Sequence, residues 1–478
     1  MQSFNNLVSG DWRVGVSYKP NVNPSNLSDV IGQYTQGDAA HVEAAVEAAN
    51  LAFPAWSAGS IQARADALDN IGNEILSRKE ELGMLLAREE GKTKSEAIGE
   101  AIRAGQIFKF FAGECLRLAG ETLPSLRQNI GIEITREPVG IVGLITPWNY
   151  PLAIPAWKIA PALAFGNCVV LKPAELVPGS AWALSEIISR SGIPAGVFNL
   201  VMGHGREIGE ALVNHPRIDA ISFTGSTSVG QHVAVQCATH QKKVQLEMGG
   251  KNPQVILDDA DLTQAVELSV KSAFYSTGQR CTASSRLIVT DGVYPKFIEM
   301  MKRRMAEINV GNALADGTDV GPVSSQLQLE QDLDYIRIGR DEGATLVAGG
   351  ERLKRETDGF YISPALFTDC SPTMRINREE IFGPVASVIR VKNYEEALFM
   401  ANDTEFGLSA GIATSSLKYA IHFKRHSQAG IVMVNLPTAG SDYHVPFGGR
   451  KKSSYGPREQ GRYAQEFFTS VKTAYTSA

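Results

Sequence analysis

Cysteine is scarce in this sequence, and its arrangement excludes two kinds of stapled domain. The chain of 478 residues contains 5 cysteines, an odd number, and no two of them form a C-x-x-C pair. A secreted disulfide framework and a structural zinc site both need paired cysteines, so neither is expected. Histidine is also rare, with 8 residues and no H-E-x-x-H spacing, and we predict no metal site. The thiols are therefore expected to be reduced.

Long apolar runs and strongly basic stretches are missing as well. No run is long enough to span a membrane, and the polar residues 1–6 lack the apolar core of a signal peptide. The net charge is −5, and the densest basic runs are the triplets 302–304 and 450–452, which gives little support to a nucleic-acid or membrane partner. With 44% hydrophobic residues, the composition is that of a globular protein. We predict a cytoplasmic protein of about three domains.

Apolar spacing predicts a helical first part and an α/β remainder. The first hundred or so residues are expected to be largely helical, with Asp38 as an N-cap. Short apolar runs, which alternate with helical segments, occupy 141–145, 168–171, 197–201, 218–223, 244–246, 253–257 and 287–289. Strands buried on both faces with helical connections indicate parallel, doubly wound sheets. Residues 130–136 and 467–475 are further β-prone segments without an obvious position, and the second suggests docking on another surface or subunit.

Parallel sheets bind ligands beyond the carboxyl ends of their strands, so we examined the residues that follow each run. The small residues 224–230 precede a predicted helix and either bind a pyrophosphate at its N-terminus or form an ordinary turn. Lys172 and Glu175 follow another strand and are either ligands of a cofactor ribose or a solvated pair.

Three further residues have side chains suited to catalysis. Cys281 lies beside Arg280 in a loop of small polar residues, an electropositive setting that would lower the thiol pKa, although such thiols are also commonly inert. Glu247 ends an apolar strand and is either a general base or an ion-pair partner. Asn149, between two prolines, either donates to an oxyanion or stabilises its turn.

Taken together and in order, these segments resemble the NAD(P)-dependent aldehyde dehydrogenase superfamily over essentially the whole chain. The motifs are Pro147-Trp148-Asn149-Tyr150-Pro151, Phe223-Thr224-Gly225-Ser226-Thr227, Leu246-Glu247-Met248-Gly249-Gly250-Lys251, Gly278-Gln279-Arg280-Cys281, Glu380-Ile381-Phe382-Gly383-Pro384 and Pro446-Phe447-Gly448-Gly449. The resemblance implies an α/β fold with a Rossmann-like cofactor domain (1–117 and 139–249), a catalytic domain (250–448), an oligomerisation arm (118–138 and 466–478) and a return segment (449–465). A homodimer or homotetramer is implied.

The resemblance also implies roles for individual residues. Cys281 would be the nucleophile and Glu247 the general base, and Asn149 with the Cys281 backbone N–H would form the oxyanion hole. Lys158 would lie beside the cofactor as a further catalytic residue. The implied cofactor is NAD, with NADP possible, and its implied ligands are Thr146, Trp148, Lys172, Glu175, Gly225, Ser226, Glu380 and Phe382. Retention of a glutamate at position 247 favours hydrolysis of a thioester over acyl transfer to coenzyme A. The segment 449–459 is a residue longer than in many relatives, which puts a role for Glu459 in doubt.

The implied substrate is an aldehyde that also carries a carboxylate. Arg280 could pair with that carboxylate, tune the thiol or face away. The loop 435–444, which includes Ser441, resembles the substrate-side loop of α-ketoglutaric semialdehyde (2,5-dioxopentanoate) dehydrogenases. Relatives further imply Tyr150, Ile154, Trp157 and Phe447 as the walls of the entry channel. Succinic semialdehyde and a broad range of small aldehydes are alternative substrates, and a non-catalytic relative and a cysteine hydrolase are alternative functions.

Overall fold

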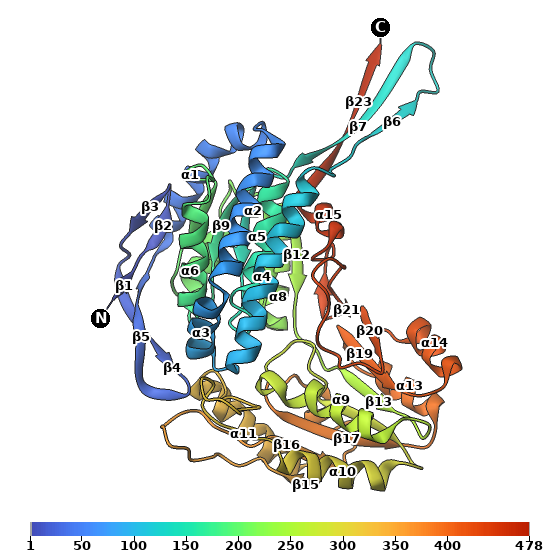
Figure 1. The fold of residues 1–478 in the computed structure, drawn as a ribbon. Coiled ribbons are helices and arrows are strands. Elements are labelled where there is room, and N and C mark those ends of the chain that lie inside the picture. The colour runs from blue at the N-terminus through green and yellow to red at the C-terminus, as the bar shows by residue number, and fades with distance from the viewer. Residues whose placement is uncertain (1, 478) are drawn as a thin grey trace.

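The computed structural model describes residues 2–477, which form two large sheets and a projecting arm (Figure 1). The first sheet has eight strands in the order β22-β12-β11-β8-β9-β10-β2-β3, in which the edge strand β22 is Ser454–Tyr455. Its centre is parallel and consists of β12 (Lys243–Glu247), β11 (Ala220–Thr224), β8 (Ile141–Ile145), β9 (Cys168–Lys172) and β10 (Phe198–Leu200). These strands are almost fully buried, as expected when helices cover both faces of a sheet. The predicted strands of this region are confirmed.

Helices surround this sheet and share one hydrophobic core with it. They are α1 (Ala39–Ser57), α2 (Ile61–Ser77), α3 (Lys79–Glu90), α4 (Lys94–Cys115), α5 (Ala153–Ala164), α6 (Pro178–Ser189), α7 (Gly205–Asn214) and α8 (Thr227–Thr239). Asp38 caps α1 by accepting from the His41 backbone N–H, which confirms its predicted role. Helix α4 packs between α2, α3 and α5, and every residue of α5 is buried.

The first 36 residues correct the prediction of a largely helical N-terminal part. They form β1 (Ser3–Phe4), β2 (Asn6–Val8), β3 (Asp11–Arg13), β4 (Ser17–Asn23) and β5 (Asn26–Gln36). Strands β4 and β5 pair as a long antiparallel hairpin, and most side chains of β4 are exposed. Backbone pairing rather than an apolar face holds this hairpin together, so the sequence carries little alternation that would reveal it. Helices begin only at Ala39.

The second sheet has seven strands in the order β15-β16-β17-β14-β13-β19-β20. The strands are β13 (Pro253–Ile256), β14 (Arg286–Thr290), β15 (Thr345–Ala348), β16 (Ala365–Thr368), β17 (Val385–Val391), β19 (Ser409–Ala413) and β20 (Ile431–Val434), all parallel to their neighbours except β15. The helices of this part are α9 (Leu262–Phe274), α10 (Tyr294–Ala306), α11 (Gln326–Asp341), α13 (Tyr394–Asn402) and α14 (Leu417–His426). Two sheets with parallel centres confirm the predicted α/β class.

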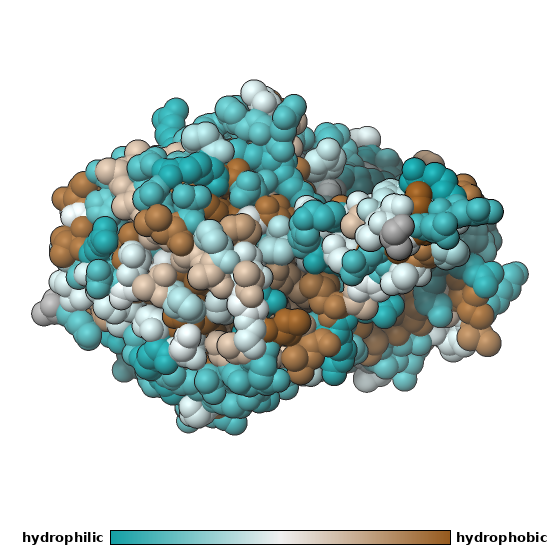
Figure 2. Space-filling view, turned by 90° about the horizontal axis from the view of Figure 1, so that it is seen from above, coloured by the Kyte–Doolittle hydropathy of each residue, from teal (hydrophilic) through white to brown (hydrophobic). Residues whose placement is uncertain are grey.

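A third, three-stranded sheet forms the arm that projects from the body (Figure 1). Strand β7 (Ile130–Pro138) pairs with β6 (Glu121–Pro124) on one side and β23 (Thr469–Ser477) on the other. The two β-prone segments of unknown position are thus partners of each other. Seen from above, apolar side chains lie among polar ones around this arm (Figure 2). No helix within residues 2–477 is long and apolar enough to cross a membrane.

Candidate active site

The parallel strands of the first sheet bring several predicted site residues to one edge. Ile145 is the register partner of Lys172, and Thr224 is the partner of Glu247, so the residues that follow β8, β9, β11 and β12 lie side by side. Two adjoining cavities of about 330 and 580 Å³ open there, and both are lined by Gly225 and Ser226.

The smaller cavity lies where the two large sheets meet. The first sheet contributes Trp148, Asn149 and Ile154, and the second part of the chain contributes Cys281, Glu380 and Phe382. The edges of Trp148 and Phe382 meet with ring centroids 5.4 Å apart. Residues separated by more than two hundred positions in the sequence therefore share one space.

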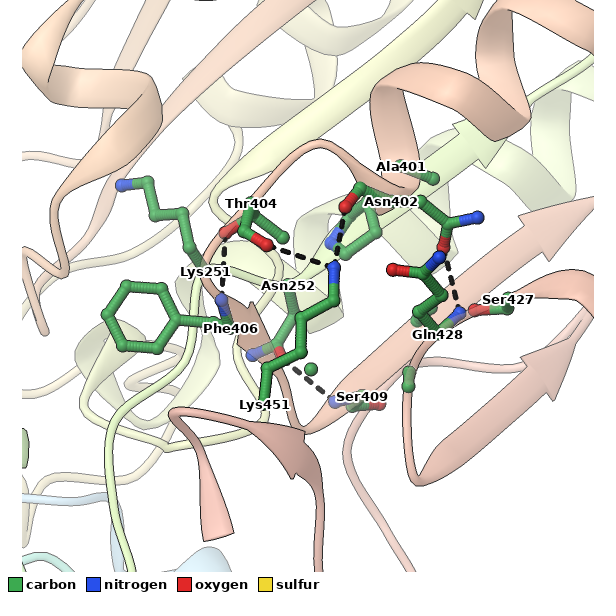
Figure 3. A pocket seen from close by; sticks show the side chains of 14 residues that line it. Lys251, Asn252, Ala401, Asn402, Thr404, Phe406, Ser409, Ser427, Gln428 and Lys451 are labelled. Atoms are coloured by element: carbon green, nitrogen blue, oxygen red, sulfur yellow. Dashed lines mark hydrogen bonds between the residues drawn. The ribbon is translucent and has the colours of Figure 1, made fainter.

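Cys281 lies on a tightly turned loop that the neighbouring strands hold in place. Ser276 and Thr277 both have a positive φ (51° and 55°), which is uncommon for residues other than glycine and marks a constrained turn. Asn252 donates from Nδ2 to the backbone oxygens of Cys281 (2.7 Å) and Ala283 (2.9 Å). Figure 3 shows Asn252 at the wall of a small neighbouring pocket, where its Oδ1 accepts from the Ser409 backbone N–H at 2.9 Å. One buried amide thus ties the loop to β19.

The electrostatic setting of Cys281 differs from the prediction. Burial raises the pKa of the Cys281 thiol to about 12, and the nearby carboxylates Glu247 and Glu380 act in the same direction. The backbone N–H groups of Cys281 and Thr282 lower this pKa, but not enough to offset burial. Arg280, expected to make the setting electropositive, donates instead to the backbone oxygens of Lys271 and Ser272 at the end of α9. The expectation of a lowered pKa was therefore wrong.

Asn149 is held from two sides. Its Nδ2 donates to the Gln279 backbone oxygen at 2.9 Å, two residues before Cys281. Lys92 donates to the Asn149 backbone oxygen and to Glu100 Oε2, each at 2.6 Å, and its ammonium lies 3.8 Å from the centre of the Tyr150 ring. The sequence did not identify Lys92 and Glu100 as site residues, because a lysine and a glutamate in a helical region usually indicate an exposed surface pair.

Glu247 belongs to a buried network of charged groups. Ser454 Oγ donates to Glu247 Oε2 at 2.5 Å, and burial together with the charge of Glu459 raises the pKa of Glu247 well above its usual value. Lys158 contacts Glu459 directly and donates to Ser222 Oγ at 2.7 Å. The structure thus places Lys158 and Glu459 next to the predicted base. Sequence reasoning missed Ser454, which lies in the longer segment that had put Glu459 in doubt.

The larger cavity contains the predicted cofactor residues Thr146, Lys172 and Glu175. Burial lowers the pKa of Lys172 to about 8, and its Nζ donates to the Pro173 backbone oxygen at 2.9 Å. Glu175 Oε1 accepts from the Gly205 N–H at 2.7 Å, and its Oε2 lies 3.6 Å from Lys19 Nζ. In the smaller cavity, Glu380 Oε1 accepts from the Gly250 N–H at 2.8 Å.

The polar groups of these cavities suit a dinucleotide. Within residues 2–477 the hydroxyls of Thr146, Thr224 and Thr227 are buried and have no hydrogen-bond partner. Helix α8 begins at Thr227, and the Ser226 side chain does not cap it, which leaves the first N–H groups of the helix available to an anion. Unpaired hydroxyls and a free helix N-terminus beside a lysine and a carboxylate fit the ribose and phosphate groups of NAD(P).

The profile of the aldehyde dehydrogenase family matches residues 13–474. This chain belongs to that family. It is 42% identical to α-ketoglutaric semialdehyde dehydrogenase of Bacillus subtilis (strain 168), over 99% of this chain and 98% of the relative. It is 39% identical to 2,5-dioxopentanoate dehydrogenase of Saccharolobus solfataricus, over 95% of each chain. A crystal structure of betaine aldehyde dehydrogenase from Staphylococcus aureus in complex with NAD+ is 33% identical, with a TM-score of 0.97 over 100% of this chain and 95% of that chain. The predicted family and fold are confirmed.

Two of the residues predicted to line the entry channel of this aldehyde dehydrogenase, Trp157 and Phe447, pack against each other. The rings of Trp157 and Phe447 have centroids 5.4 Å apart. Ser441 Oγ accepts from Arg103 Nη2 at 3.3 Å, and the Arg103 guanidinium carbon lies 6.0 Å from the centre of the Trp157 ring. Arg103, on α4, was not among the predicted site residues. Its sequence carries no distinguishing signal, because the same helix also contains Glu96, Glu100 and Lys109.

Proposed function

We propose that this enzyme oxidises an aldehyde that bears a carboxylate, with α-ketoglutaric semialdehyde as the first candidate, to the acid with NAD+, and with NADP+ as an alternative. The observation that carries the proposal is the shared cavity of Cys281, Asn149 and Glu380, with Glu247 close enough to raise the thiol pKa. A nucleophile and an oxyanion donor in one cavity, with a base near the nucleophile, are the groups that thioester chemistry needs.

In the proposed first step the Cys281 sulfur attacks the aldehyde carbon. The thiol must first lose its proton, and Glu247 is a suitable acceptor because burial and the charge of Glu459 raise its pKa, which makes it a stronger base than an ordinary carboxylate. The Asn149 amide and the Cys281 backbone N–H then donate to the oxyanion, and each such donor is typically worth about 10²–10³ in rate. A bound nicotinamide supplies the acceptor for the hydride that leaves the substrate carbon. The acyl group remains on Cys281 as a thioester.

In the proposed second step Glu247 takes a proton from the water that attacks the thioester. Glu459 and Lys158 lie next to Glu247, so these buried groups can pass on the proton that Glu247 takes up. Members of the family that transfer the acyl group to coenzyme A generally lack this glutamate. Its presence supports hydrolysis, and the carboxylic acid is the product.

We propose that the two cavities hold the two halves of the cofactor. The N-terminus of α8, with Gly225 and Ser226, would hold the pyrophosphate together with Trp148, and Thr146, Lys172 and Glu175 would hold the adenosine half. Glu380 and Phe382 would position the nicotinamide ribose and ring. Glu175 favours NAD, because a carboxylate accepts from a 2′-hydroxyl and repels a 2′-phosphate. Lys19 and Arg206 nearby are the groups that would accommodate NADP.

The similar proteins support the choice of substrate. Those named for α-ketoglutaric semialdehyde reach 42% identity, whereas the NADP-dependent succinate-semialdehyde dehydrogenase of Escherichia coli (strain K12) is 36% identical. Succinic semialdehyde and a broad range of small aldehydes remain the alternatives. The domain ranges, a cytoplasmic location and a homodimer or homotetramer formed through the arm also remain proposals.

Replacement of the nucleophile tests the proposed chemistry. Cys281→Ala should reduce aldehyde-dependent NAD(P)H formation by at least about 10³-fold, because no other group can form the thioester. Binding of NAD+ and NADP+, measured by calorimetry, should be preserved. Cys370→Ala is the matched control, because Cys370 lies in a separate hydrophobic cluster and should be dispensable. Substantial turnover by Cys281→Ala would contradict the assignment.

A further inference from the structure

Arg103 is a partly buried cation without a carboxylate partner. It lies on α4, and its Nη2 donates to Ser441 Oγ (3.3 Å) and to Gln460 Oε1 (3.0 Å). Both acceptors are neutral. Its Nε is buried without a hydrogen bond, whereas its Nη1 is neither bonded nor buried within residues 2–477. One edge of the guanidinium is therefore free for a ligand.

The acidic groups near Arg103 do not neutralise it. Glu100, one turn earlier on α4, forms an ion pair with Lys92 and also accepts from the backbone N–H groups of Leu152 and Ala153. Asp442 is exposed, and no ion pair joins it to Arg103. Removing a cation from water is costly unless a charged or strongly polar partner compensates it. The positive charge of Arg103 therefore lacks a compensating negative charge, which an anionic ligand would supply.

Arg103 lies on the substrate side of the nucleophile. Its guanidinium faces Trp157, whose ring packs against Phe447, and these two rings are the proposed channel walls. The Tyr150 hydroxyl and the Cys281 thiol both lie within electrostatic reach of Arg103. None of the residues that line the larger, cofactor-side cavity is in this group.

Arg280, the arginine that the sequence suggested, is arranged differently. Its Nη2 donates to backbone oxygens at the end of α9, and it lines a small separate pocket with Gly250 and Gly278 instead of the cavity that contains Cys281. Within residues 2–477 both arginines leave Nε and Nη1 without a hydrogen bond, but Arg103 is the one whose guanidinium faces the proposed channel wall Trp157.

We propose that Arg103, together with Ser441, binds the carboxylate of the substrate and so sets the preference of this enzyme for semialdehyde acids. This inference rests on the proposed function and deepens it. A guanidinium presents several N–H donors in one plane, which matches the two oxygens of a carboxylate, and the Ser441 hydroxyl adds a further polar group beside them. With the carboxylate held at Arg103, the aldehyde end of a short chain points into the channel toward Cys281.

The test is Arg103→Met, which keeps an unbranched apolar stem and removes the charge. We expect kcat/KM for α-ketoglutaric and succinic semialdehydes to fall about 10- to 100-fold, mainly through KM, because a charged hydrogen bond is lost far from the reacting carbon. For pentanal, which has five carbons and no carboxylate, kcat/KM should change less than about 3-fold. Added guanidinium ion should partly restore activity on the acids. Arg117→Met, at the exposed end of α4, is the matched control.

Other outcomes separate the explanations. If Arg103 only braces Gln460, the variant loses activity equally on pentanal and on the acids, which overturns the inference. An unchanged KM for the acids overturns it as well, and a selective loss in Arg280→Met would transfer the role to Arg280. Should Arg103→Met fail to fold, Arg103→Lys, which keeps the charge without the planar fork, should still raise KM selectively for the acids. Wild-type enzyme that oxidises no aldehyde refutes the proposed function itself.

Discussion

Cys281 is half-buried and Glu247 is buried, and removal from water acts on the thiol and the carboxyl group in the same direction. Each group is less stable as an anion than it would be in water, so the pKa of each is raised. Removal from water raises the pKa of the Cys281 thiol, so its anion is disfavoured until a base takes up the proton. The same burial makes Glu247 a stronger proton acceptor. Cys281 is therefore unreactive as a neutral thiol, and it becomes a nucleophile when its proton moves to Glu247.

The base should determine how the rate depends on pH. Only the ionised form of Glu247 can accept a proton, so a raised pKa means that the thioester hydrolysis rate increases with pH up to that raised pKa. Glu247→Gln should lower steady-state turnover by about 10²-fold or more and should also slow the NADH-forming burst, because Glu247 accepts a proton in both proposed steps. Stopped-flow measurement of NADH absorbance across pH distinguishes the burst from turnover.

Ser454 offers a matched control for that experiment. Its hydroxyl donates to the Glu247 carboxylate and lowers the pKa of that group. Ser454→Ala should therefore shift the acidic limb of the pH–rate profile to higher pH, with little loss at the plateau. A profile unmoved by Ser454→Ala, or an unchanged turnover in Glu247→Gln, would remove Glu247 from the role of base.

At the scale of elements, the ion pair between Lys92 and Glu100 joins α4 to the start of α5. Glu100 accepts from Lys92 and from two backbone N–H groups, and both ionic side chains are almost fully buried. Glu100→Ala leaves Lys92 with only the more distant Glu90 carboxylate, at 4.0 Å, so we expect the free energy of unfolding to fall by an amount at the lower end of about 3–5 kcal/mol. The free energy of unfolding of the variant and the wild type is measured by urea denaturation.

Two further variants separate charge from hydrogen bonding at this junction. Glu100→Gln keeps acceptors for the α5 backbone and should be less destabilising than Glu100→Ala. Glu356→Ala, in an exposed loop, should change stability by less than about 0.5 kcal/mol. A loss of only about 1 kcal/mol in Glu100→Ala would show that the ion pair is not structurally important.

The sequence predicted the central elements because they are buried on both faces. The run 141–145 became β8, and the run 168–171 became all but the last residue of β9. The hairpin of β4 and β5 was missed because exposed strands carry almost no hydrophobic period. The sequence motifs pointed to Cys281, Glu247 and Asn149, but they did not identify the neighbouring side chains that position or charge these three residues. Lys92, Arg103 and Ser454 reach the site only through tertiary packing, and single-chain spacing does not encode such contacts.

At the scale of the whole molecule, neither large sheet contains a complete site. Asn149 and Glu247 belong to the first sheet region, whereas Cys281 and Glu380 belong to the second. The carboxylate subsite adds Arg103 from α4 and Ser441 from the last quarter of the chain. A hinge of even a small angle between the two sheets would therefore separate the nucleophile from its donors. Rigid relative placement of the sheets is a requirement of the chemistry.

The arm makes the clearest prediction at this scale. Strand β23 pairs only with β7, its outer edge is open within residues 2–477, and Val471 and Tyr475 are 59% and 60% exposed. An open, partly apolar edge is a docking surface, and we expect a second copy of this chain to cover it. Val471→Lys with Tyr475→Lys should shift the assembly toward monomers in light scattering after gel filtration, because it places charges in that interface. Lys472→Gln with Thr476→Ser is the control on the same strand. A wild-type monomer at micromolar concentration, or an unchanged assembly in the lysine variant, would contradict an interface at this edge.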